Sequence, residues 1–430
     1  MRFSLLPIPL LLAAALFAHA DEVPGGHPAP RDDAKDSIAV VTGSGANTFK
    51  TVPQWGNVPD KLKIGPTHGG IVVDKKGLIY VSSDSAQGIY VFQPDGTLAK
   101  NIAAEFSGIH GLCIREEKGE EFLYAAHLRG AQALKLKLDG TAVLKIPFPE
   151  EAAASYPNGV KDYKPTAIAV APNGDIFVSD GYGKSLIHKF DAAGKYLKSF
   201  GGKGTGDGQF QTSHGLLVDT RFEKPLLLVC DRENRRLVHL DLDGNFVGVI
   251  TTGLRRPCSA SIHGDNIAIA ELEARVAIID KTNQVVAVLG DNPDKSQWAK
   301  FDIAPDWWKP GIFTAPHGVS YDAAGNLYVQ DWNKTGRVTK LVKAAPTRRS
   351  RARSPASFTV SQSPPAVTAP AFPRSGSAAA LPTRRITTAA IRPSSPHTSH
   401  TSSGSMARSR NPSCGPRMLA PFQESPSTPM

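Results

Sequence analysis

Short hydrophobic runs alternate with polar turns along most of the chain, and the same unit repeats six times between residues 47 and 343. Each unit has up to four strand-length runs rich in Val, Ile, Leu, Phe and Tyr. Turns such as residues 191–194 (Asp-Ala-Ala-Gly) supply the positive φ angles that tight hairpins need. The pattern is clearest in residues 166–201. The other five units begin at Gly69, His110, His214, Cys258 and His317.

Repeats of this kind, each a four-stranded meander, are typical of β-propeller blades. One blade cannot bury both of its faces, so the six units must close into a ring. The last unit has no clear fourth strand before residue 344, and residues 48–55 are the best candidate to complete it. The sequence therefore predicts an all-β fold: a six-bladed β-propeller over residues 47–343 in which the two ends of the domain pair.

The N-terminus has the pattern of a secretory signal peptide over residues 1–20. Arg2 is followed by an apolar run at residues 5–17 and a small-x-small cleavage sequence. The run is shorter than the roughly 20 residues that a transmembrane helix needs, so we predict no membrane span. We expect an exported protein, secreted or periplasmic, that starts near Asp21. Residues 21–46 are polar, and we expect them to be a flexible segment.

The composition changes abruptly at residue 344. Residues 344–430 are rich in Ser, Pro, Thr, Ala and Arg, lack lysine and show no hydrophobic periodicity, so we expect a disordered tail. The tail holds eleven of the 49 basic residues and one of the 39 acidic ones, which leaves 38 of each in residues 1–343. This balance argues against a nucleic-acid partner. One hypothesis is that the tail derives from a shifted reading frame. The alternative is a basic tail that binds acidic polymers.

Three histidines occupy the same position in alternate units. His110, His214 and His317 begin the first strands of units two, four and six. Alternate blades of a six-fold ring are about 120° apart, so these side chains should converge on the axis. Three imidazoles and one open position are typical of catalytic zinc. The alternative is that a His-Gly pair merely suits this corner of the repeat, since His68 and Gly69 form another, one residue out of register.

The second strands of units three and four end at the same mouth of the channel, at equivalent residues Tyr182 and Arg232. A nearby cation would lower the pKa of Tyr182 and make it a base, and Arg232 could hold a carboxylate. The alternative is a tyrosine that packs over a loop and an arginine in a surface ion pair. Further polar or aromatic residues on this rim receive no predicted role: Glu271, Glu273, Arg275, Asp331 and Trp332.

The four cysteines have no C-x-x-C spacing, so neither a zinc knuckle nor a redox motif is indicated. A disulfide between two of the first three remains open in an oxidising compartment. The cysteines are Cys113, Cys230, Cys258 and Cys414.

The most specific motifs are DGY in residues 176–185, SHGL in residues 208–219 and DREN in residues 230–235. In these motifs the chain resembles the peptidyl-α-hydroxyglycine α-amidating lyases, which are six-bladed propellers of the NHL-repeat type. The resemblance extends over most of residues 47–343.

The resemblance implies a catalytic zinc ion on three histidines: His110, His214 and His317. It also implies that Tyr182 takes a hydroxyl proton, that Arg232 holds developing charge, and that a calcium ion binds in the channel partly through the Leu112 carbonyl. The implied reaction cleaves a C-terminal α-hydroxyglycine into a peptide amide and glyoxylate. We therefore expect a small-molecule or peptide C-terminal substrate. Separately, we expect the protein to be a monomer.

Three positions depart from the lyase pattern. Residues 81–85 lack the arginine expected in unit one, Ala315 replaces a methionine, and Gly318 replaces a calcium-binding aspartate. The metal site is kept while the substrate-binding residues are altered, so the substrate can differ. Two other functions stay open. The first is a non-catalytic propeller that binds a protein or carbohydrate at its channel mouth. The second is a calcium-dependent, lactonase-like hydrolase, against which the histidine-rich register argues.

Overall fold

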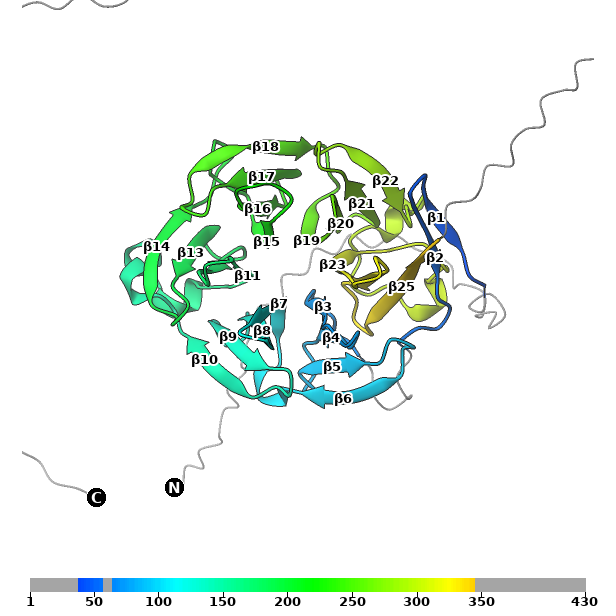
Figure 1. Ribbon diagram of the computed structural model, residues 1–430, viewed down its shortest axis with the longest axis horizontal. Coiled ribbons are helices and arrows are strands. Elements are labelled where there is room, and N and C mark those ends of the chain that lie inside the picture. The colour runs from blue at the N-terminus through cyan, green and yellow to red at the C-terminus, as the bar shows by residue number, and fades with distance from the viewer. Residues whose placement is uncertain (1–37, 57–63, 345–430) are drawn as a thin grey trace, which may run out of the picture. The chain divides into compact units, whose positions relative to one another are not determined.

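The computed structural model describes residues 38–56 and 64–344, all within Met1–Pro355, the first of two units into which the chain divides. Six antiparallel sheets stand around a central axis (Figure 1). The predicted all-β, six-bladed propeller is therefore confirmed. The predicted signal peptide, and the predicted tail beyond residue 344, lie outside the described residues.

The first three blades each contain four strands, and consecutive strands pair. Blade one comprises β3 (Ile71–Val73), β4 (Ile79–Ser82), β5 (Ile89–Phe92) and β6 (Leu98–Ile102). Blade two comprises β7 (Ile109–Glu117), β8 (Glu120–His127), β9 (Gln132–Lys137) and β10 (Ala142–Ile146). Blade three comprises β11 (Ala167–Val170), β12 (Ile176–Ser179), β13 (Leu186–Phe190) and β14 (Tyr196–Gly201).

Blades four and five repeat this order, while blade six draws strands from both ends of the domain. Blade four comprises β15 (Ser213–Asp219), β16 (Leu226–Asp231), β17 (Arg236–Leu240) and β18 (Phe246–Thr252). Blade five comprises β19 (Pro257–His263), β20 (Asn266–Glu271), β21 (Arg275–Ile279) and β22 (Val285–Leu289). Blade six comprises β23 (Pro316–Tyr321), β24 (Leu327–Asp331), β25 (Arg337–Lys343), β2 (Asn47–Thr51) and β1 (Val41–Ser44).

The ring closes where β2 pairs with β25, with Phe49 opposite Lys343 and Thr51 opposite Leu341. This confirms the prediction that residues 48–55 complete the last blade, although the strand itself ends at Thr51. Phe49 is fully buried in a hydrophobic cluster shared by blades five and six. Closure therefore depends on apolar packing as well as on strand pairing.

The sequence prediction is wrong for strand β1, which lies inside residues 21–46, the segment predicted to be flexible. It forms a hairpin with β2, in which Val41 is opposite Lys50 and Ser44 is opposite Asn47. The Thr42 hydroxyl also accepts a hydrogen bond from the Gly290 N–H, at 2.8 Å. Its residues are mostly exposed and show no hydrophobic alternation. Backbone pairing with β2 orders this strand, and polarity alone could not reveal that pairing.

Neighbouring blades bury each other's faces. One cluster combines Tyr80 and Val91 of blade one with Leu123 and Leu134 of blade two. Such sharing is the reason a single blade could not be stable alone. The helical elements are short 3-10 segments: η2 (Ala104–Phe106), η3 (Glu150–Ser155), η4 (Gly159–Asp162), η5 (Lys295–Gln297) and η6 (Pro305–Trp307). Over the residues described, none of the helices has the length and hydropathy to span a bilayer.

Candidate metal centre

His110, His214 and His317 each occupy the second position of an inner strand, in β7, β15 and β23. In all three strands the pairing register shifts at the histidine, which marks a β-bulge. A bulge turns a side chain away from the regular alternation of the strand. The centroids of the three rings lie 4.5 to 5.1 Å apart, and each residue is buried. The predicted convergence of the three histidines is therefore confirmed.

The glycine after each histidine lets the next blade approach. A Cβ at Gly215 would overlap the carbonyl oxygen of Cys258, and the Nδ1 atom of His214 lies 2.7 Å from that oxygen. In the same way His110 Nδ1 lies 2.6 Å from the Thr166 carbonyl oxygen. The His-Gly pair does suit this corner of the repeat, and it also orients the ring. A structural role for the His-Gly pair is therefore compatible with a role for the histidine in binding a metal ion.

The far sides of two rings face Tyr182. Its hydroxyl lies 3.2 Å from His110 Nε2 and 3.0 Å from His214 Nε2, and it accepts a hydrogen bond from Arg232 Nη1 at 3.2 Å. Both Nδ1 atoms donate to carbonyl oxygens, so both Nε2 atoms carry lone pairs. One hydroxyl proton cannot satisfy two lone pairs, and His317 Nδ1 is also buried without a partner. The centre is short of hydrogen-bond donors, and a cation could occupy the unsatisfied lone pairs.

Electrostatics keep these rings neutral. Burial, reinforced by Arg232 and the neighbouring imidazoles, holds the pKa of His110, His214 and His317 well below its ordinary value. Neutral imidazole is the form that binds metal ions. Burial raises the pKa of Tyr182 to about 12, against the opposing effect of Arg232. A cation at the histidines would lower it.

Arg232 is fixed by a charged neighbour. Its Nε donates a hydrogen bond to Glu233 at 2.8 Å. The same carboxylate accepts a hydrogen bond from Arg256 Nη2 at 2.7 Å. The guanidinium also lies against the Tyr182 ring, 5.3 Å from its centroid. The structure therefore brings Tyr182 and Arg232 together as predicted, while their chemical roles stay predictions.

Two further side chains reach the centre that the prediction did not include. Potential ligand atoms of His68, His110 and His317 lie within 4.8 Å of one another, as do those of His214, Cys258 and His317. Cys258 occupies the bulge of blade five that corresponds to the histidine positions. Its equivalence was visible in the sequence. His68 lies one residue out of register, so the repeat pattern alone does not assign it to the centre.

Carboxylates at the end of the second strands hold the loops of this mouth. Asp231 accepts the Gln211 N–H at 2.8 Å, and Asp331 accepts the Ala315 N–H at 2.7 Å. Asp180 and Glu271 do the same in blades three and five. Asp331 and Glu271, which had no predicted role, are thus structural residues. An acid recurring at the end of the second strand was the signal that could have identified them.

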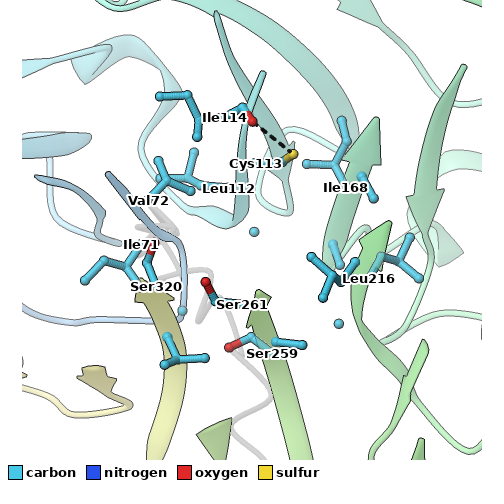
Figure 2. Close-up of a pocket in the computed structure, with 18 of the residues that line it drawn as sticks. Ile71, Val72, Leu112, Cys113, Ile114, Ile168, Leu216, Ser259, Ser261 and Ser320 are labelled. Atoms are coloured by element: carbon cyan, nitrogen blue, oxygen red, sulfur yellow. Dashed lines mark hydrogen bonds between the residues drawn. The ribbon is translucent and has the colours of Figure 1, made fainter. Parts of the chain in front are cut away.

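All six inner strands line a cavity of about 370 Å³ along the axis, which includes the three histidines and Leu112. Figure 2 shows Leu112, Ile168 and Leu216 on the wall of this channel, together with Ser259 and Ser261. Calcium requires six to eight oxygen ligands, usually including carboxylates. No carboxylate is among the described residues that line the cavity. They fit calcium poorly, and we derive no role for that ion.

Cys113, Cys230 and Cys258 are all free thiols. The disulfide left open by the sequence does not form among them, and Cys414 lies outside the described residues. Cys230 and Cys258 are buried, and burial raises the pKa of both thiols.

No family model matches the chain. It is 30% identical over 192 residues to peptidyl-alpha-hydroxyglycine alpha-amidating lyase 2 of Drosophila melanogaster, covering 42% of this chain and 43% of that protein. It is 39% identical over 79 residues to peptidylglycine alpha-amidating monooxygenase of Rattus norvegicus, covering 17% of this chain and 8% of that protein. The chain thus spans less than half the length of these relatives.

Among solved structures, a gluconolactonase from Xanthomonas campestris matches with a TM-score of 0.51 at 11% identity, covering 75% of this chain and 99% of that one. A likeness at this identity supports the propeller fold alone. The sequence similarity to the curated relatives is the more specific finding. The propeller therefore resembles the peptidyl-α-hydroxyglycine α-amidating lyases, as its motifs predict.

Proposed function

We propose that this protein is a zinc-dependent lyase that cleaves a C-terminal α-hydroxyglycine, or a closely related hydroxylated carboxylate, into an amide and glyoxylate. One observation carries the proposal: the Nε2 atoms of His110 and His214 converge on the Tyr182 hydroxyl, which also accepts from Arg232. The names of the curated relatives support this class of reaction. The matched region covers less than half of each relative. The lyase activity is therefore proposed for this chain and does not follow from the similarity alone.

A zinc ion on the three histidines would polarise the hydroxyl oxygen of the substrate. In this proposal Tyr182 takes the hydroxyl proton as a general base. When that proton leaves, the oxygen forms a carbonyl group, the carbon–nitrogen bond breaks, and the nitrogen takes up a proton to become the amide. Arg232 stabilises negative charge on the Tyr182 oxygen by donating a hydrogen bond to it.

The substrate-binding side of the pocket differs from the lyase pattern at blade one, where residues 81–85 hold no arginine. A basic side chain from blade two contacts this segment: Arg129, whose Nη2 donates to the Asp84 carbonyl oxygen at 3.2 Å. Arg129 is exposed and lies on the loop after β8. In this proposal Arg129, from blade two, binds the substrate carboxylate in place of the arginine that the lyase pattern has in blade one.

We also propose that the protein is exported, on the basis of the signal-peptide pattern at residues 1–20. N-terminal sequencing of protein from the native host would give a mature start near Asp21. A chain that retains Met1 would contradict export by this route.

The test begins with metal content by plasma mass spectrometry on the full-length chain, purified without a histidine tag. We expect about one zinc or similar divalent ion per chain. The triple variant His110→Ala/His214→Ala/His317→Ala should contain none. Turnover of an α-hydroxyglycine peptide should then be assayed by glyoxylate release.

His263→Ala is a matched control, because His263 lies at the opposite end of β19 from Cys258 and packs on Tyr321. That variant should keep both the metal and the activity. A wild-type protein that binds no metal even after reconstitution would refute the proposal. Metal binding without turnover of any hydroxyglycine substrate would favour the non-catalytic propeller.

A further inference from the structure

A fourth imidazole stands at the metal centre. His68 lies just before blade one, and the centroid of its ring is 4.7 Å from that of His110 and 5.5 Å from that of His317. Potential ligand atoms of these three histidines are within 4.8 Å of one another. The His68 side chain is 22% exposed, whereas the other two are nearly inaccessible. It is therefore the most accessible of these three rings.

The backbone around His68 is built to hold this position. Thr67 bridges Asn333 of blade six, and its hydroxyl donates to the Asp331 carbonyl oxygen at 2.6 Å. Gly69 has a φ of +123°, and a Cβ there would overlap His317 Nδ1. A side chain on residue 69 would thus push the segment away from blade six. Thr67 therefore anchors His68 on one side. On the other side, Gly69 lets the chain approach the His317 ring closely.

An acid orients the His68 ring. Its Nδ1 atom lies 3.1 Å from Asp84 Oδ2. Asp84 is itself held, because its N–H donates to the Pro66 carbonyl oxygen at 2.8 Å and its own carbonyl oxygen accepts from Arg129. A carboxylate on one ring nitrogen, with the other nitrogen facing an ion, is a recurring arrangement at metal sites. The arrangement leaves His68 Nε2 available.

A surface ion pair between His68 and Asp84 is the simpler reading, and such pairs are common. It does not account for the position of the ring, whose centroid lies 4.7 Å from that of His110 and 5.5 Å from that of His317. His68 also lies nearly parallel to Trp332, at an interplanar angle of 27°.

We propose that His68 is a fourth metal ligand, so that four imidazoles would hold the ion. This inference rests on the proposed metal site. Zinc can expand from four to five ligands, and cobalt, nickel and copper also accept nitrogen-rich sites. The chain would then differ from a three-histidine centre by a ligand that its own blade one supplies.

The test uses the full-length protein loaded with Zn²⁺ or Co²⁺ alone. X-ray absorption at the metal edge should indicate about four imidazoles in the wild type and about three in His68→Ala. Metal affinity, measured by competition with a chelator, should fall on the order of 100-fold in His68→Ala, and about 10- to 100-fold in Asp84→Asn, which removes only the orienting charge. The visible absorption of bound Co²⁺ should change in both variants. His263→Ala should match the wild type in every measurement.

Two results would overturn the inference. If the wild type binds one ion through three imidazoles, and His68→Ala leaves its affinity and Co²⁺ spectrum unchanged, His68 is not a ligand while the three-histidine site stands. If the wild type binds no ion, the proposed metal site fails and His68 fails with it. Should His68→Ala not fold, His68→Gln and Asp84→Asn provide the same comparison.

Discussion

The Nδ1 atom of His214 in blade four lies 2.7 Å from the carbonyl oxygen of Cys258 in blade five. This bond selects the tautomer whose Nε2 lone pair faces the axis. It forms because Gly215 has no side chain to separate the two inner strands. The orientation of a candidate metal ligand thus depends on packing between two blades.

Gly215→Ala should disturb this packing. The new methyl group would overlap the Cys258 carbonyl oxygen, and we expect the free energy of unfolding to fall by about 1–3 kcal/mol. Metal affinity should fall about 10- to 100-fold, since the orienting bond to His214 is weakened. Urea unfolding and chelator competition measure the two effects. Gly248→Ala is the control, because its surroundings are open; it should change neither quantity appreciably.

Tyr182→Phe should separate catalysis from metal binding. The ring stays in place while the hydroxyl is lost, so we expect one ion per chain to remain and lyase turnover to fall about 100- to 10,000-fold. Glyoxylate release and metal content are the measurements. Tyr196→Phe removes a hydroxyl that bonds Ser199 elsewhere in blade three, and should leave turnover unchanged. Full activity in Tyr182→Phe would rule out its role as the base.

The fold should lose stability in acid through Asp219. This buried carboxylate binds Arg221 at 2.8 Å and His239 at 3.1 Å, and these bonds outweigh burial and hold its pKa well below the ordinary range. A group with a depressed folded-state pKa stabilises the fold above its unfolded value of about 4, and this contribution is lost as the pH falls further.

Asp219→Asn should therefore lower the free energy of unfolding at pH 7 by about 3–5 kcal/mol, because it leaves the buried Arg221 charge unpaired. The difference from wild type should shrink as the pH falls below 4, as followed by urea unfolding across pH. Asp265→Asn disrupts an exposed pair with Lys281 and should have an effect below about 1 kcal/mol. Equal effects of the two substitutions would contradict the conclusion that Asp219 stabilises the fold through its buried pair with Arg221.

Ring closure should depend on Phe49. Phe49→Ala removes a fully buried ring from the cluster between blades five and six, and should cost about 3–5 kcal/mol of unfolding free energy. Val41→Ala, on the exposed strand β1, should cost much less because the Val41 side chain is 62% exposed. Thermal unfolding of both variants gives the comparison.

Much of the architecture could be predicted from local pattern. The turn at residues 191–194 forms as expected: Asp191 Oδ1 accepts the N–H groups of Ala193 and Lys195, and Gly194 has a φ of 82°. The pairing of residues 47–51 with the last unit could also be predicted, because that unit lacked a strand. Strand β1 could not, because its exposed residues carry no periodic signal.

The blades, their number and the equivalence of His110, His214 and His317 can be predicted from the amino-acid order, because each blade repeats one local pattern of strands and turns. Which side chains meet at the axis depends on how the folded blades pack against one another. His68 is out of register, and it joins the centre because Gly69 lets blade one approach His317 of blade six. Two more such contacts join residues far apart in the sequence: Asp84 contacts the His68 ring, and the Thr166 carbonyl oxygen contacts the His110 ring. Such contacts depend on how the ring closes, and closure is a property of all six blades together.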